Sequence, residues 1–114
     1  MSYDKNMLSG NTAMLILKLL EEKDMYGYQI IEEISKKSGS LFNLKTGTLY
    51  PLMHGLEKDG TVNSYDETAN QRVRKYYSLT GKGRSLLLKK EQEWQSYVTA
   101  VNRLMKPVGQ KGFN

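Results

Sequence analysis

The sequence predicts a mainly α-helical α+β fold, in which three short helices and a small β-hairpin are followed by one long C-terminal helix. Three observations predict it. Apolar residues recur at helical spacing in three segments before residue 60. The pattern then changes to a period of two between residues 61 and 79. After residue 80 a helical pattern resumes and continues without proline to Met105.

The first two helices carry clear apolar faces. Asn11 or Thr12 can cap the first, in which apolar residues follow at i, i+3, i+4 and i+7; these are Ala13, Ile16, Leu17 and Leu20. The second is expected over residues 26–37, and residues 38–40, Ser-Gly-Ser, end it.

The third helix repeats the same spacing with Leu49, Leu52, Met53 and Leu56. Thr46 or Thr48 opens it. Pro51 is tolerated only near a first turn, which places the helix start close to Gly47. Gly60 stops the helix.

A two-stranded hairpin follows. Residues 61–67 and 72–79 are rich in strand formers, and residues 68–71 form a polar turn. Alternation places Val73, Tyr77 and Leu79 toward the core. A hairpin of two strands is marginal unless it packs on helices.

Thr80 can cap the fourth helix, which extends to about Met105 and is ~37 Å long. We therefore expect three segments: a compact domain over residues 1–80, a single long helix over 81–106, and a flexible tail over 107–114.

Three helices followed by a hairpin form a winged helix-turn-helix, whose third helix enters the DNA major groove while the hairpin, or wing, lies alongside. The predicted DNA contacts on the helix are Lys45, Thr46, Thr48, Tyr50 and His54; those on the wing are Asn70, Gln71, Arg72, Arg74 and Lys75. Each has an alternative. Tyr50 can be a half-buried packing residue, His54 can lie on a solvated face, and the wing charges can protect an edge strand from aggregation.

The charge distribution agrees with this arrangement. The net charge is +5, and no acidic residue occurs in residues 34–56 or 68–90. The second stretch holds seven bases: Arg72, Arg74, Lys75, Lys82, Arg84, Lys89 and Lys90. Two such segments that meet in space form a footprint for a polyanion, and the alternative is a generic basic surface.

The composition argues against other classes. The chain has 114 residues, the length of one domain, with no cysteine and one histidine. Thiolate metal sites, cysteine nucleophiles and disulfides are excluded, so we expect no enzyme activity, metal or cofactor. No apolar run approaches the ~20 residues of a membrane span, and no secretory signal is visible, so we expect a cytoplasmic protein without membrane contact.

Three segments resemble the PadR-like transcriptional regulators of bacteria. Residues 47–60, GTLYPLMHGLEKDG, are similar to the family's recognition helix. Residues 74–83, RKYYSLTGKG, are similar to its second wing strand, and residues 26–30, YGYQI, to its second-helix opening. The resemblance covers about residues 8–105, with one departure: Gly55 stands where the family usually has a basic residue. The single terminal helix resembles the short subgroup, which includes multidrug-sensing repressors with an aromatic-lined pore at the dimer interface.

The fourth helix carries an apolar seam with heptad-like spacing, formed by Leu87, Trp94, Val98, Val101 and Met105 and interrupted by Glu91. We expect it to pack on a second copy of the chain, as the resemblance also implies; the alternative is packing on the first helix. The resemblance further implies that Trp94 contacts a planar aromatic effector, and the alternative is a tryptophan of the dimer core without a ligand.

These expectations describe a dimeric DNA-binding transcriptional regulator, a repressor of an adjacent promoter that a small molecule relieves. Its operator would be a pseudo-palindrome in double-stranded DNA. The alternative is a winged-helix module that mediates protein–protein contact without DNA binding.

Overall fold

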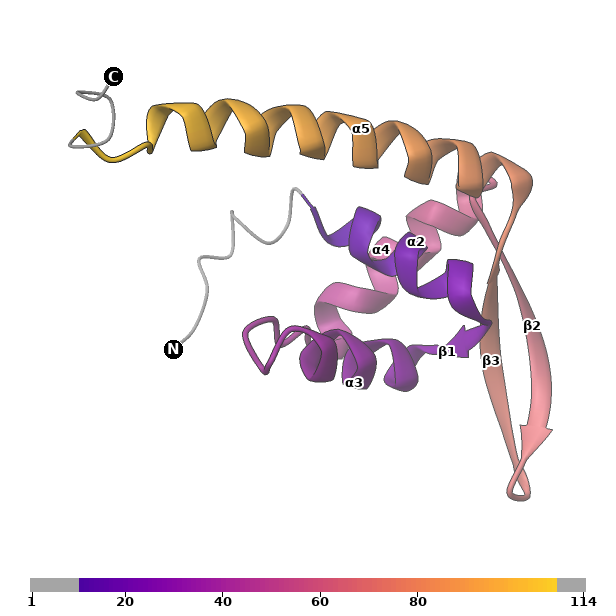
Figure 1. Cartoon of the computed structure of the whole chain (residues 1–114). Helices are drawn as coiled ribbons and strands as arrows, with labels where there is room; N and C mark the ends of the chain where they lie inside the picture. Colours follow the sequence, from indigo (N-terminus) through magenta and orange to yellow (C-terminus); the bar gives the residue numbers. More distant parts are fainter. Residues whose placement is uncertain (1–10, 109–114) are drawn as a thin grey trace.

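Residues 11–108 are described by a computed structural model, in which four helices lie on one side of a three-stranded antiparallel sheet (Figure 1). The elements in chain order are α2 (Thr12–Glu22), β1 (Met25–Tyr26), α3 (Gly27–Lys37), α4 (Thr46–Lys58), β2 (Val62–Ala69), β3 (Arg72–Leu79) and α5 (Gly81–Leu104). The predicted α+β class and the predicted order of helices and hairpin are confirmed. None of the helices in this part of the chain has the length and hydropathy needed to cross a membrane.

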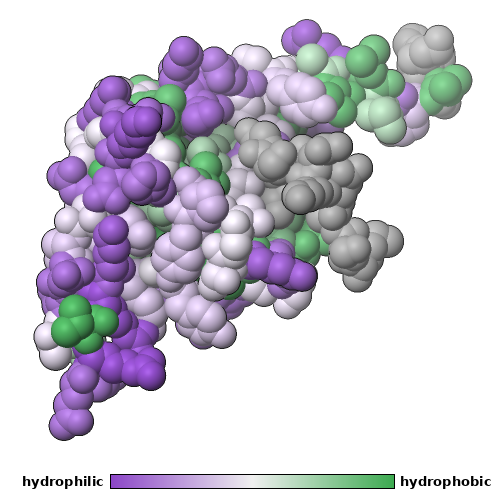
Figure 2. All heavy atoms as spheres, turned by 180° about the vertical axis from the view of Figure 1, so that it is seen from behind, coloured by the Kyte–Doolittle hydropathy of each residue, from purple (hydrophilic) through white to green (hydrophobic). Residues whose placement is uncertain are grey.

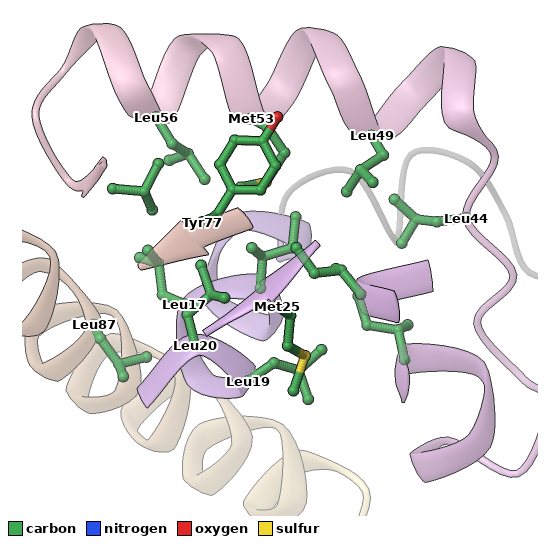
Figure 3. Packing of buried hydrophobic residues seen from close by; sticks show 14 residues of the cluster. Leu17, Leu19, Leu20, Met25, Leu44, Leu49, Met53, Leu56, Tyr77 and Leu87 are labelled. Carbon is green, nitrogen blue, oxygen red and sulfur yellow. The ribbon is translucent and has the colours of Figure 1, made fainter. Parts of the chain in front are cut away.

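The hydrophobic core lies between α2, α4 and the inner face of the sheet. Ile16 and Leu17 of α2 are fully buried. Figure 3 shows Met53 of α4 beside Tyr77 of β3, with Leu49 pointing from the same helix into the core near Leu44. Each such side chain contributes roughly 1.5–3 kcal/mol on burial. This core therefore fixes α4 and the base of the hairpin relative to each other.

The turn between α3 and α4 is held by local hydrogen bonds. The Ser38 hydroxyl donates to the Ser35 carbonyl at 3.1 Å and accepts from the Phe42 N–H at 2.9 Å. Gly39 and Ser40 both have positive φ angles, of 64° and 67°, which end α3 where the sequence predicted. Buried Leu44 then anchors the chain before α4 begins.

Pro51 lies deeper in its helix than expected. Helix α4 begins at Thr46, close to the predicted start, but Pro51 is its sixth residue and falls in the second turn. Because proline has no N–H, the Gly47 carbonyl lacks its ordinary helical donor. The buried neighbours Leu49 and Met53 hold the helix in place on both sides of this gap.

The sheet has a third strand that the sequence did not predict. Strand β1 pairs antiparallel with β3, Met25 with Tyr77 and Tyr26 with Tyr76, giving the order β1-β3-β2. Two residues are too few to show alternation, and Tyr26, expected as the first residue of a helix, is instead the N-cap of α3. β1 attaches the helix-turn-helix to the hairpin.

The hairpin is longer than predicted and closes through two residues. Asn70 and Gln71 have φ angles of 52° and 63°, which is typical of the type I′ turns that join twisted strands. The core position predicted for Val73 is wrong, because its side chain is 70% exposed. The outer half of the hairpin extends beyond the helices (Figure 1), and the hairpin residues that reach the core, Val62, Tyr77 and Leu79, all lie at its base.

Helix α5 starts on a tight backbone junction. The Thr80 hydroxyl accepts from the Gly83 N–H at 3.0 Å, which confirms the predicted cap, and donates to the Gly60 carbonyl at 2.7 Å. A Cβ on Gly83 would clash with the Thr61 carbonyl oxygen and lie 2.6 Å from Leu79 Cδ1. The first turn of α5 therefore lies directly against the loop between α4 and β2, and glycine is what permits it.

We predict that Gly83→Ala lowers the free energy of unfolding by about 1–3 kcal/mol, because the added methyl group must displace the Thr61 backbone. The matched control is Gly81→Ala in the same turn, where a Cβ meets open space. It should be neutral or stabilise by up to about 1 kcal/mol. Urea denaturation followed by circular dichroism measures both free energies of unfolding. Equal stabilities for the two variants would contradict the close approach of Gly83 to the Thr61 carbonyl.

Candidate nucleic-acid interface

The start of α4 presents an uncapped, positive helix end to solvent. Lys45 is the N-cap, and its carbonyl accepts from the N–H groups of Thr48 and Leu49 at 3.0 and 2.9 Å. Leu49 turns into the core, while Lys45, Thr46 and Thr48 are exposed. The first turn carries no acidic residue, so the partial positive charge of the helix end remains available to an anion.

Tyr50 lies against the start of α3. A Cβ on Gly27 would lie 2.7 Å from Tyr50 Cζ, so the absence of a side chain there lets the ring settle on the α3 backbone. The ring nevertheless remains 45% exposed. Tyr50 thus combines packing with an exposed surface. The two alternatives drawn from the sequence, a DNA contact and a half-buried packing residue, are compatible.

The wing carries its charges in two environments. Arg72 is exposed near the hairpin tip, beside Asn70 and Gln71. Arg74 is half-buried, and its guanidinium carbon lies 4.2 Å from the centre of the Tyr26 ring. The two arginines share one face of β3 because they are two residues apart.

Lys75 belongs to the opposite face of β3. Its ammonium group lies 3.8 Å from a carboxylate oxygen of Glu57 on α4, and the Ser64 hydroxyl donates to the same carboxylate. The exposed ion pair contributes little to stability. It engages Lys75 with a carboxylate of its own chain, which sets this residue apart from Arg72 and Arg74.

Residues of the helix-turn-helix and of the wing line one shared hollow of about 780 Å³. It contains four of the residues predicted from the sequence, Tyr50, Arg72, Arg74 and Lys75, and these therefore meet at one site. Its other lining residues are Tyr26, Gly27, Tyr28, Glu32 and Val73. Sequence reasoning missed Tyr26, Tyr28 and Glu32; the one available signal was the Tyr-Gly-Tyr segment, whose central glycine permits a close approach.

A row of tyrosines crosses the sheet face that carries Arg74. Tyr65 of β2 stacks on Tyr76 of β3 with ring centres 5.8 Å apart, and Tyr76 meets Tyr26 of β1 edge-on at 5.4 Å. The Tyr65 hydroxyl donates to Asp24 at 2.7 Å, and this hydrogen bond is the main cause that raises the pKa of Tyr65 to about 12. The row links all three strands on one face.

His54 is exposed on α4, one turn beyond Tyr50. Within residues 11–108, no group of three or more histidine, cysteine, aspartate or glutamate side chains is placed to hold a metal ion. The chemistry of this surface is therefore that of hydrogen-bond donors, cations and tyrosine rings.

The seam of α5 divides into a buried and an exposed part. Leu87 is only 1% exposed and packs in the core of its own chain, so the structure assigns it to intramolecular packing on α2 rather than to an open face (Figure 3). Glu91, which interrupts the seam, lies 3.5 Å from Lys18 of α2. The pKa of Lys18 is raised, first by its hydrogen bond to Glu21 and then by the charges of both carboxylates.

The rest of the seam lies beyond α2. Trp94 is 37% exposed and stacks on Tyr97 with ring centres 5.9 Å apart. Val98 and Val101 are half-buried, and Met105 is exposed. Figure 2 shows hydrophobic surface at this distal end of the molecule, where α5 projects from the body. The tail predicted over residues 107–114 lies outside the described residues from 109 onward.

Comparison with known proteins identifies relatives of this arrangement. A family model described as the transcriptional regulator PadR-like family matches residues 16–89. A transcriptional regulator of Mycobacterium tuberculosis is 32% identical over 72 residues, which cover 63% of this chain and 64% of that protein.

Solved structures agree in fold and length. The structure of a transcriptional regulator from Clostridium thermocellum is 33% identical, covers 90% of this chain and 100% of that chain, and superposes with a TM-score of 0.82. A PadR family transcriptional regulator from Eggerthella lenta is 30% identical, covers 89% and 87% of the two chains, and has a TM-score of 0.77. The similarity therefore includes α5 as well as the helix-turn-helix and the wing.

Proposed function

This chain belongs to the PadR-like family of DNA-binding transcriptional regulators, and from that premise we propose that it is a homodimeric repressor acting on an adjacent promoter in the cytoplasm. Residues 1–80 would bind the operator and residues 81–106 would form the dimer. A small planar aromatic molecule would relieve repression. The observation that carries the proposal is that Tyr50 of α4 lines one hollow together with the wing residues Arg72, Arg74 and Lys75. The exposed first turn of the same helix carries no acidic residue.

In this proposal α4 enters the major groove and the wing follows the backbone. Lys45, Thr46 and Thr48 reach base edges, and His54 reaches the same groove one turn on. Tyr50, Arg72 and Arg74 contact phosphates, with a weaker contribution from Lys75 because Glu57 holds it. Asn70 and Gln71 touch the backbone from the hairpin tip. Two-fold symmetry then requires a pseudo-palindromic operator with half-sites ~10 bp apart or a multiple of that spacing.

We predict that Arg72→Ala weakens binding to a mixed-sequence duplex and lowers the slope of log K against log salt by about 0.9, the value for one lost phosphate contact. Fluorescence anisotropy of a labelled duplex over a salt series measures it. The control is Arg103→Ala, which removes the same charge at the far end of α5. An unchanged slope for Arg72→Ala would exclude that contact. If the wild-type protein bound no duplex at low salt, a protein–protein module would be the better explanation.

The dimer is proposed to form through the distal half of α5, where Trp94, Val98, Val101 and Met105 leave an apolar face beyond the reach of α2. Leu87 stays in the core of its own chain. An exposed apolar helix face next to a folded body favours an isologous contact with a second copy. The likeness to the regulator from Clostridium thermocellum covers that whole chain and therefore extends along this helix.

We predict that Val101→Glu raises the dimer dissociation constant at least about tenfold, because a carboxylate replaces buried apolar surface in both copies. The control is Ser96→Glu, an exposed position about 140° around the same helix. Analytical ultracentrifugation at several concentrations measures both. A Val101→Glu protein that dimerised as strongly as the wild type would place the interface elsewhere.

Trp94 is proposed as the effector contact. One face of its ring stacks on Tyr97 of the same helix, so a planar ligand has the other face available. Near a two-fold axis the partner's equivalent ring would offer a second face, and each stacked pair contributes about 0.5–1.5 kcal/mol beyond burial. Glu91 adds little attraction for a cationic ligand because Lys18 already lies beside it.

We predict that a planar aromatic dye quenches the fluorescence of Trp94, the single tryptophan, and weakens operator binding in the same concentration range. In Trp94→Leu, which has no tryptophan left to report quenching, the dye should leave operator binding unchanged when that binding is measured by anisotropy. A dye panel that gave neither quenching nor loss of DNA affinity would leave Trp94 as a residue of the dimer core.

A further inference from the structure

We propose that Tyr26 is a positioning residue for DNA binding: its ring holds the Arg74 guanidinium over the hollow between α3 and β3, ready to contact a DNA phosphate. The inference rests on the proposed DNA contact of the wing. It adds a residue that touches no base and that the sequence patterns did not single out for DNA.

The first support is the difference between the two wing arginines. Arg72 and Arg74 share one face of β3, yet Arg72 is exposed while Arg74 is half-buried with its guanidinium carbon 4.2 Å from the Tyr26 ring centre. At this distance the cation is attracted by the face of the ring. Arg74 therefore has a defined position before any ligand arrives.

The second support is that the Tyr26 ring is itself fixed. Tyr26 pairs with Tyr76 along the backbone and caps α3, where its N–H donates to the Gln29 side chain at 3.4 Å. Its ring meets Tyr76 edge-on, Tyr76 stacks on Tyr65, and the Tyr65 hydroxyl donates to Asp24. A flexible arginine is thus placed on a ring that the sheet and α3 hold from several sides.

The third support is the location. Strand β1 ends at Tyr26, where the chain turns into α3, so the outer part of β3 has no strand beside it on that edge. The hollow lies along this free edge and is lined by Arg72 and Arg74 on one side and by Tyr28 and Tyr50 on the other. A sugar–phosphate strand would place its anionic groups beside the arginines.

A guanidinium held over a tyrosine ring suits this task. It has five N–H donors that fan out in one plane, so contact with one ring leaves donors available to a phosphate oxygen. Holding the side chain in advance also reduces the conformational freedom lost on binding. Glu32 lines the same hollow and repels phosphate, which restricts the anion to the arginine side.

The test is a double-mutant cycle on a labelled 30-bp mixed-sequence duplex, with Tyr26→Leu, Arg74→Ala and the pair. Tyr26→Leu should weaken binding about two- to five-fold, the range of an exposed cation–π contact. It should have no further effect once Arg74 is alanine. Tyr26→Phe, which keeps the ring, should bind like the wild type.

The matched control repeats the cycle with Arg72→Ala, in which Tyr26→Leu should keep its full effect, because the ring does not hold Arg72. A general loss of structure would reduce binding in both backgrounds and would overturn the proposal, as would additive effects of Tyr26→Leu and Arg74→Ala. A wild-type protein that bound no duplex would reject the proposed function itself. Binding by the wild type with an additive cycle would reject only the role of Tyr26.

A second measurement needs no change at Tyr26. The ring should shift the Arg74 side-chain NMR signals upfield, and these are assigned by comparison with Arg74→Lys. An upfield shift that persists when the duplex is added supports the proposal. Signals at ordinary positions in the free protein, or a shift lost on DNA binding, would overturn it.

Discussion

The architecture depends on one backbone contact, in which the first turn of α5 rests on the loop between α4 and β2. Gly83 has no side chain there, so its backbone approaches the Thr61 carbonyl, and the Thr80 hydroxyl joins both sides of the contact. The end of α4, both ends of the hairpin and the start of α5 all meet at this place. The orientation of the wing and the direction of α5 are consequently set by the same few atoms.

Periodicity predicted the helices because each has a one-sided apolar pattern. In α5 the cap, Thr80, is also identifiable from local chemistry. Periodicity did not predict the features that depend on contacts between distant parts of the chain. Strand β1 is two residues long and exists only because β3 lies beside it. Val73 fits the alternation of a core strand, but the hairpin continues past the helices, so the pattern has nothing to pack on. The heptad spacing of Leu87 is the same whether the side chain packs on α2 of its own chain or on a second copy.

The residues of the candidate DNA interface divide in the same way, into those that the sequence identifies and those that only the fold brings together. Residues at the start of α4 and the wing arginines are identifiable because helix ends and base-rich hairpins carry their own chemical signal. The opposite wall of the hollow, with Tyr28 and Glu32, comes from the first half of α3, at least forty residues from the wing arginines in sequence. Only the fold places these residues together. Gly27 is an example. Its lack of a side chain matters because the Tyr50 ring packs against it, and Tyr50 lies far away along the chain.

The junction also bears on how an event at the distal end of α5 reaches the wing. A single residue, Thr80, separates the end of β3 from the start of α5, and its hydrogen bonds are satisfied on both sides. A connection of one residue is too short to absorb a rotation of α5. A change in the angle of α5 must therefore move the hairpin, alter the packing of Leu87 on α2, or do both. A ligand at the distal end alters DNA affinity only if it favours one of these arrangements over the other. The Lys18–Glu91 pair and buried Leu87 resist the second movement. The wing reaches the hydrophobic core only at its base and offers the easier movement.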